Sequence, residues 1–304
     1  MRVFLTGASG MVGRNAKSHE NARQFDILGP TRQELDLSDF EGVVKFLKKN
    51  KPDIIIHAAG KVGGIKANIE DPYGFLIENI TIGINIIRAA KECGVSRLIN
   101  LGSSCIYPND RITPLRETEI LTGPLEPTNE GYALSKILAI RMCDYISDQF
   151  SELNFKSIIP CNIYGPFDKF RDDSAHLIPA IIHKVHQAVI SGNETVKVWG
   201  DGSARREFMF AGDLGGFLWE ACNRFDSLPQ IMNVGLGHDY TIKEYYEAVS
   251  SVIGFNGQFE FDPSQPTGMK RKLTCTKQSI KWGWMPNTEL IQGIKQTYEY
   301  YKSL

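Results

Sequence analysis

Short apolar runs alternate with longer amphipathic stretches along the first half of the chain. The apolar runs are rich in β-branched residues and are bounded by Gly, Asp, Pro or Ser, a pattern typical of buried strands. Strands that alternate with helices predict an α/β fold with a doubly wound parallel sheet and right-handed crossovers. The predicted strands are 3–6, 26–28, 53–59, 97–103 and 156–162, and the clearest predicted helices are 75–93 and 130–150.

The pattern changes after Gly165 and Pro166. We expect a Rossmann-type dinucleotide-binding domain, residues 1–165 with about 207–232, and a smaller C-terminal α/β substrate lobe, about 166–206 with 233–304. Residues 14–24 are so polar that the first helix should be short, frayed or exposed. Later elements are predicted as helices over 176–190, 213–225, 242–254 and from Thr288, a strand over 196–199 and a basic loop over 200–208.

Composition narrows the class of protein without naming an activity. The 304 residues are 42% hydrophobic and 23% charged, as in ordinary soluble globular proteins. A formal net charge of −1 gives no reason to expect nucleic acid or an anionic membrane as a partner, and no apolar run approaches the ~20 residues that span a bilayer. The six cysteines show no CxxC pair, which argues against a metal site or a disulfide framework. Because the chain opens directly with MRVFLTG, we expect no secretory leader and a cytoplasmic protein.

A glycine-rich turn follows the first predicted strand. In VFLTGASGMVG the strand leads directly into GxxGxxG, formed by Gly7, Gly10 and Gly13. Glycines there let the backbone approach a pyrophosphate, which binds at the following helix N-terminus. Turns and close packing also select glycine, but the position after the first strand favours a dinucleotide site. The predicted contacts in this turn are Gly7, Ser9, Gly10, Met11, Val12 and Gly13.

The end of the second strand favours NADPH over NADH. An acidic residue there would bind a free ribose 2′-hydroxyl, whereas an arginine suits a 2′-phosphate. The chain reads ILGPTRQELDLSD, so Arg32 lies near this point and no carboxylate stands directly at the strand end. Asp36 and Leu37 would then lie near the adenine. The alternative is that Arg32 is only a solvated charge at a helix entry.

Ser103, Tyr132 and Lys136 form a chemically coherent set. Ser103 follows the apolar strand RLINLG, and the motif GYALSK places Tyr132 and Lys136 four residues apart on one helix face. The two hydroxyls can hold a carbonyl oxygen as negative charge develops on it. Lys136 would lower the pKa of the Tyr132 phenol, and Tyr132 would protonate the oxygen of a carbonyl that is being reduced. Each residue alone would more often be structural. The three together, behind a dinucleotide-binding turn, predict a redox enzyme.

The chain resembles the GDP-L-fucose synthases, the epimerase-reductases of GDP-4-keto-6-deoxymannose within the extended short-chain dehydrogenases. The resemblance covers nearly the whole chain and rests on KVGGI (61–65), LGSSCIYP (101–108), GPLEPTNEGYALSK (123–136), NIYGP (162–166), HLIPA (176–180) and VWGDGSARREF (198–208). It implies a homodimer, with the helices around 75–93 and 130–150 at the interface.

The resemblance also implies a second acid–base pair, with Cys105 as the base and His176 as the acid that together epimerise the carbons beside the C4 ketone. Without the family, Cys105 would read as a small buried hydrophobic residue and His176 as a helix-start residue. The substrate would be a GDP-linked 4-keto sugar. The resemblance places Ser104, Asn162, Lys184, Trp199, Arg206 and Lys272 against this substrate, and Ala58, Ala59, Gly60, Leu101, Lys136, Pro160, Asn162, Ile163 and His176 against NADP(H).

Three positions depart from the family. Ser9 replaces a basic residue that could face the 2′-phosphate, which weakens the expectation of NADPH. Lys184 stands where the family commonly has Arg. The family's PDGTxRK corresponds to 266–272, PTGMKRK, which lacks the Asp at position 267. A GDP-4-keto-heptose or a dideoxy sugar therefore stays open as the substrate.

Three other functions compete with an epimerase-reductase. The nearest is a 4-reductase of a related GDP-4-keto sugar, such as a heptose, that does not epimerise; the pair Cys105 and His176 argues against it. A 4,6-dehydratase or 4-epimerase is disfavoured because the SSC segment lacks an Asp-Glu pair. A non-catalytic dinucleotide-sensing protein would need no proton donor, so the Ser–Tyr–Lys set argues against that reading.

Overall fold

Six parallel strands form the main sheet, in the order β10-β5-β4-β3-β1-β2. The computed structural model describes residues 1–111, 114–171, 175–264 and 269–304. The expected doubly wound α/β fold is confirmed, and the added strand β10 was not predicted. The strands are β1 (Arg2–Thr6), β2 (Asp26–Leu28), β3 (Ile54–His57), β4 (Arg97–Leu101), β5 (Asn154–Pro160) and β10 (Ile231–Val234).

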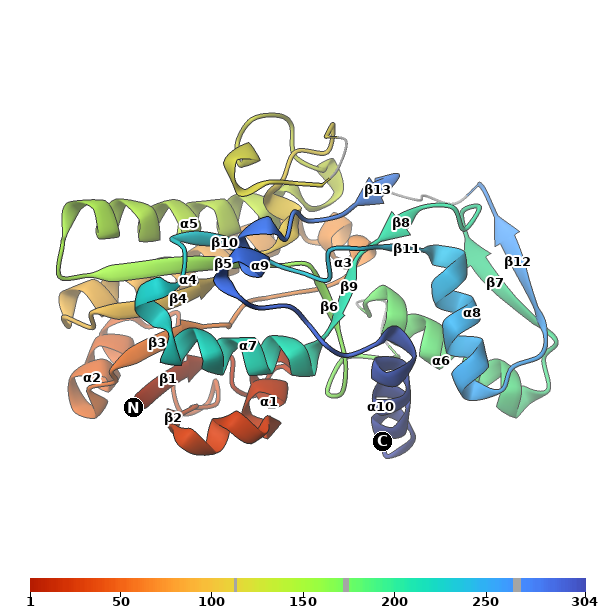
Figure 1. The fold of residues 1–304 in the computed structure, drawn as a ribbon, viewed down its shortest axis with the longest axis horizontal. Helices are drawn as coiled ribbons and strands as arrows, with labels where there is room; N and C mark the ends of the chain where they lie inside the picture. Colours follow the sequence, from red (N-terminus) through yellow and green to blue (C-terminus); the bar gives the residue numbers. More distant parts are fainter. Residues whose placement is uncertain (112–113, 172–174, 265–268) are drawn as a thin grey trace.

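Helices cover both faces of this sheet (Figure 1). Successive strand residues point to opposite faces, so Phe4 packs with one helical layer and Leu5 with the other. One layer consists of α2 (Phe40–Asn50), α4 (Pro72–Glu92) and α5 (Glu130–Gln149), and the other of α1 (Met11–Ser18) and α7 (Ala211–Asn223). A helix from late in the chain, α7, therefore packs on the same face of the sheet as α1.

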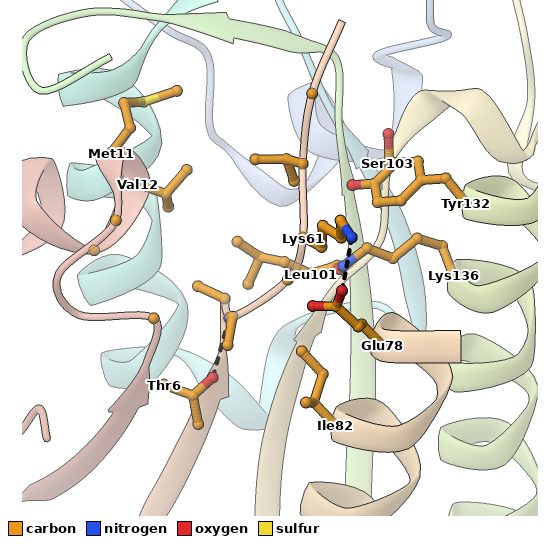
Figure 2. A pocket seen from close by; sticks show the side chains of 18 of the residues that line it. Thr6, Met11, Val12, Lys61, Glu78, Ile82, Leu101, Ser103, Tyr132 and Lys136 are labelled. Carbon is orange, nitrogen blue, oxygen red and sulfur yellow. Dashed lines mark hydrogen bonds and ion pairs between the residues drawn. The ribbon is translucent and has the colours of Figure 1, made fainter. Parts of the chain in front are cut away.

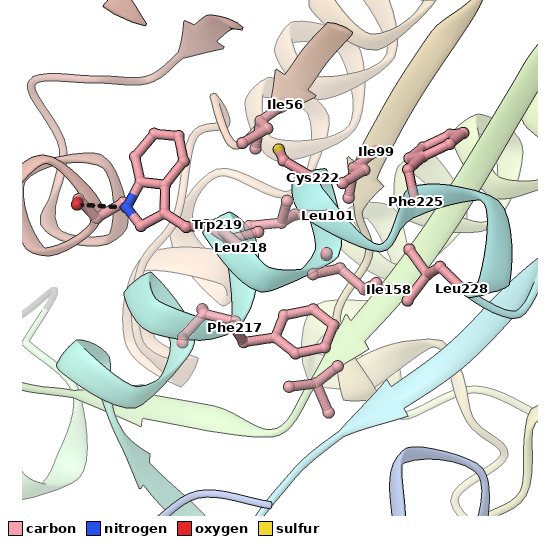
Figure 3. Close-up of a cluster of buried hydrophobic side chains, with 14 of the residues drawn as sticks. Ile56, Ile99, Leu101, Ile158, Phe217, Leu218, Trp219, Cys222, Phe225 and Leu228 are labelled. Carbon is pink, nitrogen blue, oxygen red and sulfur yellow. Dashed lines mark hydrogen bonds between the residues drawn. The ribbon is translucent and has the colours of Figure 1, made fainter. Parts of the chain in front are cut away.

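The first helix is short, as its polarity predicted, but it is not exposed on its inner side. Helix α1 has eight residues, and a 3-10 helix, η1 (Glu20–Gln24), follows it. Asn15 and Ala16 are buried. The Asn15 amide donates hydrogen bonds to Met11 O at 2.9 Å and Pro166 O at 2.8 Å. The Trp219 indole donates to Ala16 O at 2.8 Å (Figure 3). Burial was underestimated because satisfied polar groups can lie in a core.

A second core joins three helices to a strand pair. Its buried residues include Ile182, Tyr245, Val249, Ile294 and Tyr301. This unit lies beyond the carboxyl ends of the main-sheet strands, and the C-terminus ends in it (Figure 1). It contains α6 (Leu177–Ser191), α8 (Ile242–Ile253), α10 (Leu290–Lys302) and the parallel pair β7 (Thr195–Trp199) with β12 (Gln258–Asp262).

Short strands connect the two cores. Part of the predicted basic loop over 200–208 is in fact strand, because β8 (Arg205–Arg206) pairs with β11 (Tyr240–Thr241) and β13 (Arg271–Lys272). A further pair joins β6 (Asn162–Tyr164) to β9 (Phe208–Phe210). The remaining elements are α3 (Ile65–Glu70), α9 (Lys277–Trp282) and the 3-10 helices η2 (Ser104–Ile106), η3 (Glu117–Glu119), η4 (Pro127–Asn129) and η5 (Phe225–Ser227).

The C-terminal third also contributes to the main core. Trp282 and Trp284 pack edge-on against Phe217 of α7, at ring-centroid distances of 5.8 and 4.9 Å. Trp282 and Trp284 therefore belong to the same core as helices α1 and α7. The predicted domain boundaries stay a prediction.

Among the described helices, none is long and apolar enough to cross a membrane.

Candidate active site

A cavity of about 940 Å³ lies along the carboxyl edge of the main sheet, lined by the segments that follow β1, β3, β4 and β5. The chain leaves β1 toward one side of the sheet and reaches β3 on its other side, so the strand order reverses here. Open α/β sheets bind ligands at such a reversal. Figure 2 shows Met11 and Val12 on one wall, and Ser103, Tyr132 and Lys136 on the other.

In the glycine turn, the backbone lies very close to the segment after β3 and to the start of the turn itself. Gly7 has φ +68°, and a Cβ atom there would lie 2.8 Å from Ala59 Cα. A Cβ atom at Gly13 would lie 2.6 Å from Ala8 Cα. Gly10 caps α1 with no side-chain hydrogen bond, so the first N–H groups of α1 lack intrahelical partners beside the cavity. Glycine spacing, a helix N-terminus and an elongated cavity together fit the pyrophosphate of a dinucleotide.

Every residue predicted to bind the cofactor lines this cavity. Arg32 is exposed at its rim, next to Asp36 and Leu37. Asp36 accepts hydrogen bonds from the backbone and hydroxyl of Ser38 at 2.9 and 2.8 Å, and these bonds lower the pKa of Asp36. The carboxylate nearest to Arg32 is thus already engaged by Ser38.

Ser103, Tyr132 and Lys136 converge at the opposite end. The Lys136 Nζ atom donates to Leu101 O at 3.0 Å and lies 5.7 Å from the centroid of the Tyr132 ring. Ser103 follows β4, and its hydroxyl accepts from Cys105 N at 3.5 Å. Hydrogen bonding to Ser103 also acts on the phenol of Tyr132. The two hydroxyls and the ammonium therefore border one region of the cavity, as their spacing predicted.

The pKa of Tyr132 differs from the expectation. Burial raises it above its ordinary value, with the nearby Cys105 acting in the same direction and Ser103 against it. The expected lowering by Lys136 is not found, because the ammonium is directed at Leu101 O and burial lowers its own pKa to about 8. A raised pKa keeps Tyr132 protonated near neutral pH, which suits a proton donor.

Cys105, His176 and Lys272 line the same cavity. Cys105 is buried, and burial raises the pKa of its thiol. The positive charge of Lys272 is the largest effect in the opposite direction, followed by the Ser103 hydrogen bond and the charge of Lys136. The site therefore supplies two cations that favour a thiolate at Cys105. His176 caps helix α6 without a side-chain hydrogen bond to the helix.

The residues predicted to bind substrate divide into two groups. Asn162 and Lys272 line the cavity, and Asn162 also donates to Glu207 O at 2.9 Å. Four others do not belong to the described lining: Ser104, Lys184, Trp199 and Arg206. Ser104 is buried in η2, so a contact to substrate is not supported by its placement. Position 267, where the family's Asp is missing, lies outside the described residues.

The other three residues lie in two pairs outside the described lining. Arg206 pairs in register with Lys272 across strands β8 and β13. Lys184 lies with its ammonium 6.0 Å from the Trp199 ring, and Trp199 is 58% exposed. Arg206 thus lies beside a residue of the cavity lining, and Lys184 and Trp199 form a separate basic and aromatic pair.

Several lining residues were not predicted. Lys61 forms ion pairs with Asp71 Oδ2 at 2.8 Å and Glu78 Oε1 at 2.6 Å, and Lys61 and Glu78 both line the cavity (Figure 2). Thr6 accepts from Ala59 N at 3.1 Å and so fixes the turn after β3. KVGGI follows β3 as Ser103 follows β4, a signal that could have placed Lys61 here. Among the described residues, no group of three or more His, Cys, Asp or Glu could hold a metal ion.

A family model described as the NAD dependent epimerase/dehydratase family matches residues 3–235. This chain belongs to that family. It is 48% identical over 301 residues to a GDP-L-colitose synthase of Yersinia pseudotuberculosis, covering 99% of this chain and 98% of the relative. It is 44% identical over 300 residues to a GDP-L-fucose synthase of Azorhizobium caulinodans, covering 99% and 96%. The resemblance to the GDP-L-fucose synthases is confirmed.

Solved structures give the same result for the fold. MlghC, a GDP-mannoheptose C4 reductase of Campylobacter jejuni solved with NADP bound, superimposes with a TM-score of 0.89 at 29% identity. The match covers 99% of this chain and 98% of that chain. The expected Rossmann-type fold with a smaller C-terminal α/β unit is thereby confirmed. The NADP molecule belongs to the structure of MlghC.

Proposed function

We propose that this chain is an NADPH-dependent epimerase-reductase that converts a GDP-linked 4-keto sugar in nucleotide-sugar biosynthesis. One observation carries the proposal: Ser103, Tyr132 and Lys136 border the same cavity as Cys105 and His176. An enzyme that only reduces the ketone needs only Ser103, Tyr132 and Lys136. A cavity that also presents a thiol and an imidazole can move protons at carbon before the ketone is reduced.

The glycine turn and the N-terminus of α1 would bind the pyrophosphate of NADPH, with Arg32 toward the 2′-phosphate. NADPH bound there would supply the hydride for reduction at C4. Ser103 and Tyr132 would hold the ketone oxygen and stabilise its developing negative charge. Tyr132 would then protonate that oxygen, and Lys136, whose Nζ lies 5.7 Å from the centroid of the Tyr132 ring, would place a positive charge at the same end of the cavity.

Epimerisation would use the same oxygen-binding hydroxyls. A proton next to the ketone becomes removable when Ser103 and Tyr132 stabilise the enolate oxygen. The thiolate of Cys105 would remove that proton from one face of the sugar, and His176 would return one to the other face. Lys272, at the same cavity, would favour the thiolate by its charge.

Two relatives indicate the class of sugar. Relatives at 48% and 44% identity are a GDP-L-colitose synthase and a GDP-L-fucose synthase. Both names denote an L-sugar linked to GDP, so we propose a 4-keto-6-deoxy or a 4-keto-dideoxy sugar as the substrate. The second candidate is a 4-reductase without epimerisation, favoured by the similarity to the mannoheptose C4 reductase. Cys105 and His176 in the cavity favour the first.

We also propose a homodimer formed by α4 and α5. The two helices pack together and expose apolar side chains: Tyr73 and Ile77 from α4, and Leu134, Leu138 and Tyr145 from α5. Exposed apolar residues gathered on neighbouring helices indicate a protein interface. Sedimentation equilibrium should give twice the mass of the chain. The cytoplasmic location expected from the sequence stays a prediction.

The proposed activity can be tested with a panel of GDP-4-keto sugars. NADPH oxidation would be followed for the 6-deoxymannose, 3,6-dideoxy and heptose compounds, and NMR would identify each product. A reduced product inverted beside the former ketone supports the proposal. Reduction with retained configuration at C3 and C5 would establish the simple 4-reductase, and no NADPH oxidation with any sugar would overturn both candidates.

A further inference from the structure

One carboxylate spans the three-stranded sheet β11-β8-β13. Asp239 stands directly before β11, at one edge of this sheet, and its side chain is 2% exposed. Its Oδ1 atom accepts from Arg205 Nε of β8 at 2.7 Å, and its Oδ2 atom accepts from Arg271 Nε of β13 at 2.5 Å. Arg205 Nη2 also donates to the Asp239 carbonyl oxygen at 2.6 Å, and Arg271 Nη2 donates to Oδ1 at 3.2 Å. Asp239 therefore ties the outer strand β13 to the other two strands.

The two arginines keep this carboxylate ionised. Burial disfavours the charged form of Asp239, but the hydrogen bonds from Arg271 and Arg205 outweigh burial and lower its pKa. Hydrogen bonds between charged groups are stronger than neutral ones. The side chains of Arg205 and Arg271 are 37% and 48% exposed, so water can solvate both cations if Asp239 loses its charge. A variant at Asp239 should therefore still fold.

The two arginines and Lys272 lie on opposite faces of the small sheet. The register of β8 and β13 pairs Arg205 with Arg271 and Arg206 with Lys272. Side chains alternate between the two faces along a strand, so Lys272 points away from the face that Asp239 occupies. Lys272 lines the cavity, whereas Asp239 and its two arginines are outside the described lining. Asp239 thus lies behind the strand that presents Lys272 to the cavity.

The ammonium of Lys272 is available to an anionic ligand. Among the residues that the structure describes, no carboxylate forms an ion pair with it. Burial lowers the pKa of this ammonium. A poorly solvated cation is costly unless it is paired, so an anion in the cavity would stabilise it. In the proposed reaction, the anionic part of the substrate is the diphosphate of GDP.

Strand pairing alone is a weak support for Lys272. Strand β13 is two residues long, and short isolated strand pairs are marginally stable. After Lys272, the chain is held by Glu207, whose buried carboxylate accepts from the backbone N and the hydroxyl of Thr274 at 2.8 Å each. Before Lys272, it is held by Asp239 through the arginine of β13. Two buried carboxylates therefore anchor the segment on either side of Lys272.

We propose that Asp239 is a positioning residue that holds strand β13 so that Lys272 presents its charge to the diphosphate of a GDP-linked substrate. This inference rests on the proposed function and deepens it, because it names a residue outside the cavity on which substrate affinity depends. The glycine turn lies on other elements, so Asp239 should affect the binding of the sugar nucleotide and not that of NADPH.

The test is Asp239→Asn, with GDP binding measured by isothermal titration calorimetry and NADPH binding by fluorescence titration. Asparagine has nearly the same shape but lacks the charge that both arginines bind. We expect the affinity for GDP to fall at least about fivefold and the affinity for NADPH to stay within about twofold. Arg271→Met, which removes the link from the side of β13, should have the same effect. Asp239→Glu keeps the charge and should recover part of the affinity.

A double-variant cycle shows whether Asp239 acts through Lys272. Lys272→Met should weaken GDP binding by itself, and in that background Asp239→Asn should cause less than about a twofold further loss. Asp213→Asn is the matched control, because it neutralises a carboxylate that is bonded to Thr288 at 2.8 and 3.1 Å and lies outside the described cavity lining. This control should leave the affinity for GDP unchanged.

The outcomes separate this inference from the proposed function. If the native protein binds GDP and Asp239→Asn binds it equally well, the positioning role is overturned while the proposed function stands. The role is also overturned if Asp239→Asn weakens NADPH binding as much as GDP binding, or adds its full loss to that of Lys272→Met. If the native protein binds neither GDP nor a GDP-4-keto sugar, the proposed function fails and this inference fails with it.

Discussion

The ammonium of Lys136 donates a hydrogen bond of 3.0 Å to the carbonyl oxygen of Leu101, which joins helix α5 to the end of strand β4. Lys136 is 7% exposed. Burial lowers the pKa of Lys136 from 10.5 to about 8, and Cys105 acts in the opposite direction. The fold therefore keeps a poorly solvated cation beside the phenol that donates the proton.

Lys136→Met should stabilise the protein while it inactivates reduction. The folded-state pKa lies below the unfolded value, so the charged form is penalised in the folded state. The penalty, about 3 kcal/mol, is complete below pH 8 and disappears as the pH rises toward 10.5. The hydrogen bond to Leu101 offsets about 1 kcal/mol. Urea denaturation at pH 7 should show a free energy of unfolding higher by about 1–2 kcal/mol, and a decrease would contradict this account.

Reduction should weaken as the pH rises through about 8. Lys136 is charged below that value and loses its proton above it. Other titratable groups in this region include Cys105, Tyr132, Lys272 and His57, and burial lowers the pKa of His57 to about 3, so His57 stays neutral. The value of kcat/KM for the sugar should fall on the alkaline side. Arginine cannot lose its charge in this range, so Lys136→Arg should remove the fall of kcat/KM above pH 8. If the fall is unchanged in this variant, the titrating group is not Lys136.

Tyr132→Phe should slow reduction at least about 100-fold, because the ring remains and only the proton donor is lost. Cofactor affinity should change little, since the glycine turn lies at the other end of the cavity. Single-turnover NADPH oxidation and fluorescence titration of NADPH measure the two effects separately. Near-normal turnover would remove Tyr132 from the assigned role.

Cys105→Ser should abolish deuterium uptake beside the ketone while sparing reduction. The serine hydroxyl is far less acidic than a thiol, so Lys272 and Lys136 cannot make it a useful base. The product should keep the C3 and C5 configuration of the substrate, because Ser103 and Tyr132 remain. NMR of the sugar in heavy water checks both points. Continued uptake at the native rate would show that Cys105 only packs.

Arg32→Ala should narrow the preference for NADPH over NADH. A charge-assisted contact to a phosphate contributes about 1.5–3 kcal/mol, so the ratio of the two kcat/KM values should fall at least about tenfold. Because Ser9 takes the place of a basic residue in the turn, the native preference should be modest. Faster turnover with NADH in the native protein would mean that Arg32 is a surface charge.

The sheet and the cofactor site follow from local sequence patterns. Strand alternation and the turn from Gly7 to Gly13 depend on neighbours in the chain, so periodicity and spacing suffice to predict them. The burial of α1 against α7 depends on the contact between Ala16 and Trp219, about 200 residues apart, and no local pattern contains it. The same holds for the substrate surface, where Arg206 meets Lys272 through a strand pair too short to predict.

The pKa of Tyr132 illustrates a second limit. Sequence spacing places Lys136 on the same helix face, but the sign of the pKa shift depends on burial and on where the ammonium points. Both are tertiary properties: the cavity wall buries the phenol, and Leu101 O receives the ammonium. The role of Tyr132 as a proton donor could thus be predicted from the residue types. The direction of its pKa shift could not be predicted without the fold.

The indole of Trp219 stacks on Phe25 at 4.8 Å as well as bonding to Ala16, so helix α7 completes the packing beneath the glycine turn. Helix α7 begins at Ala211, after α6 and the strand β7 of the second core. A ribosome that has released only the first 165 residues has therefore produced every side chain of the glycine turn but not its support. During synthesis, the dinucleotide site can reach its final form only after the chain has passed through the second core and returned.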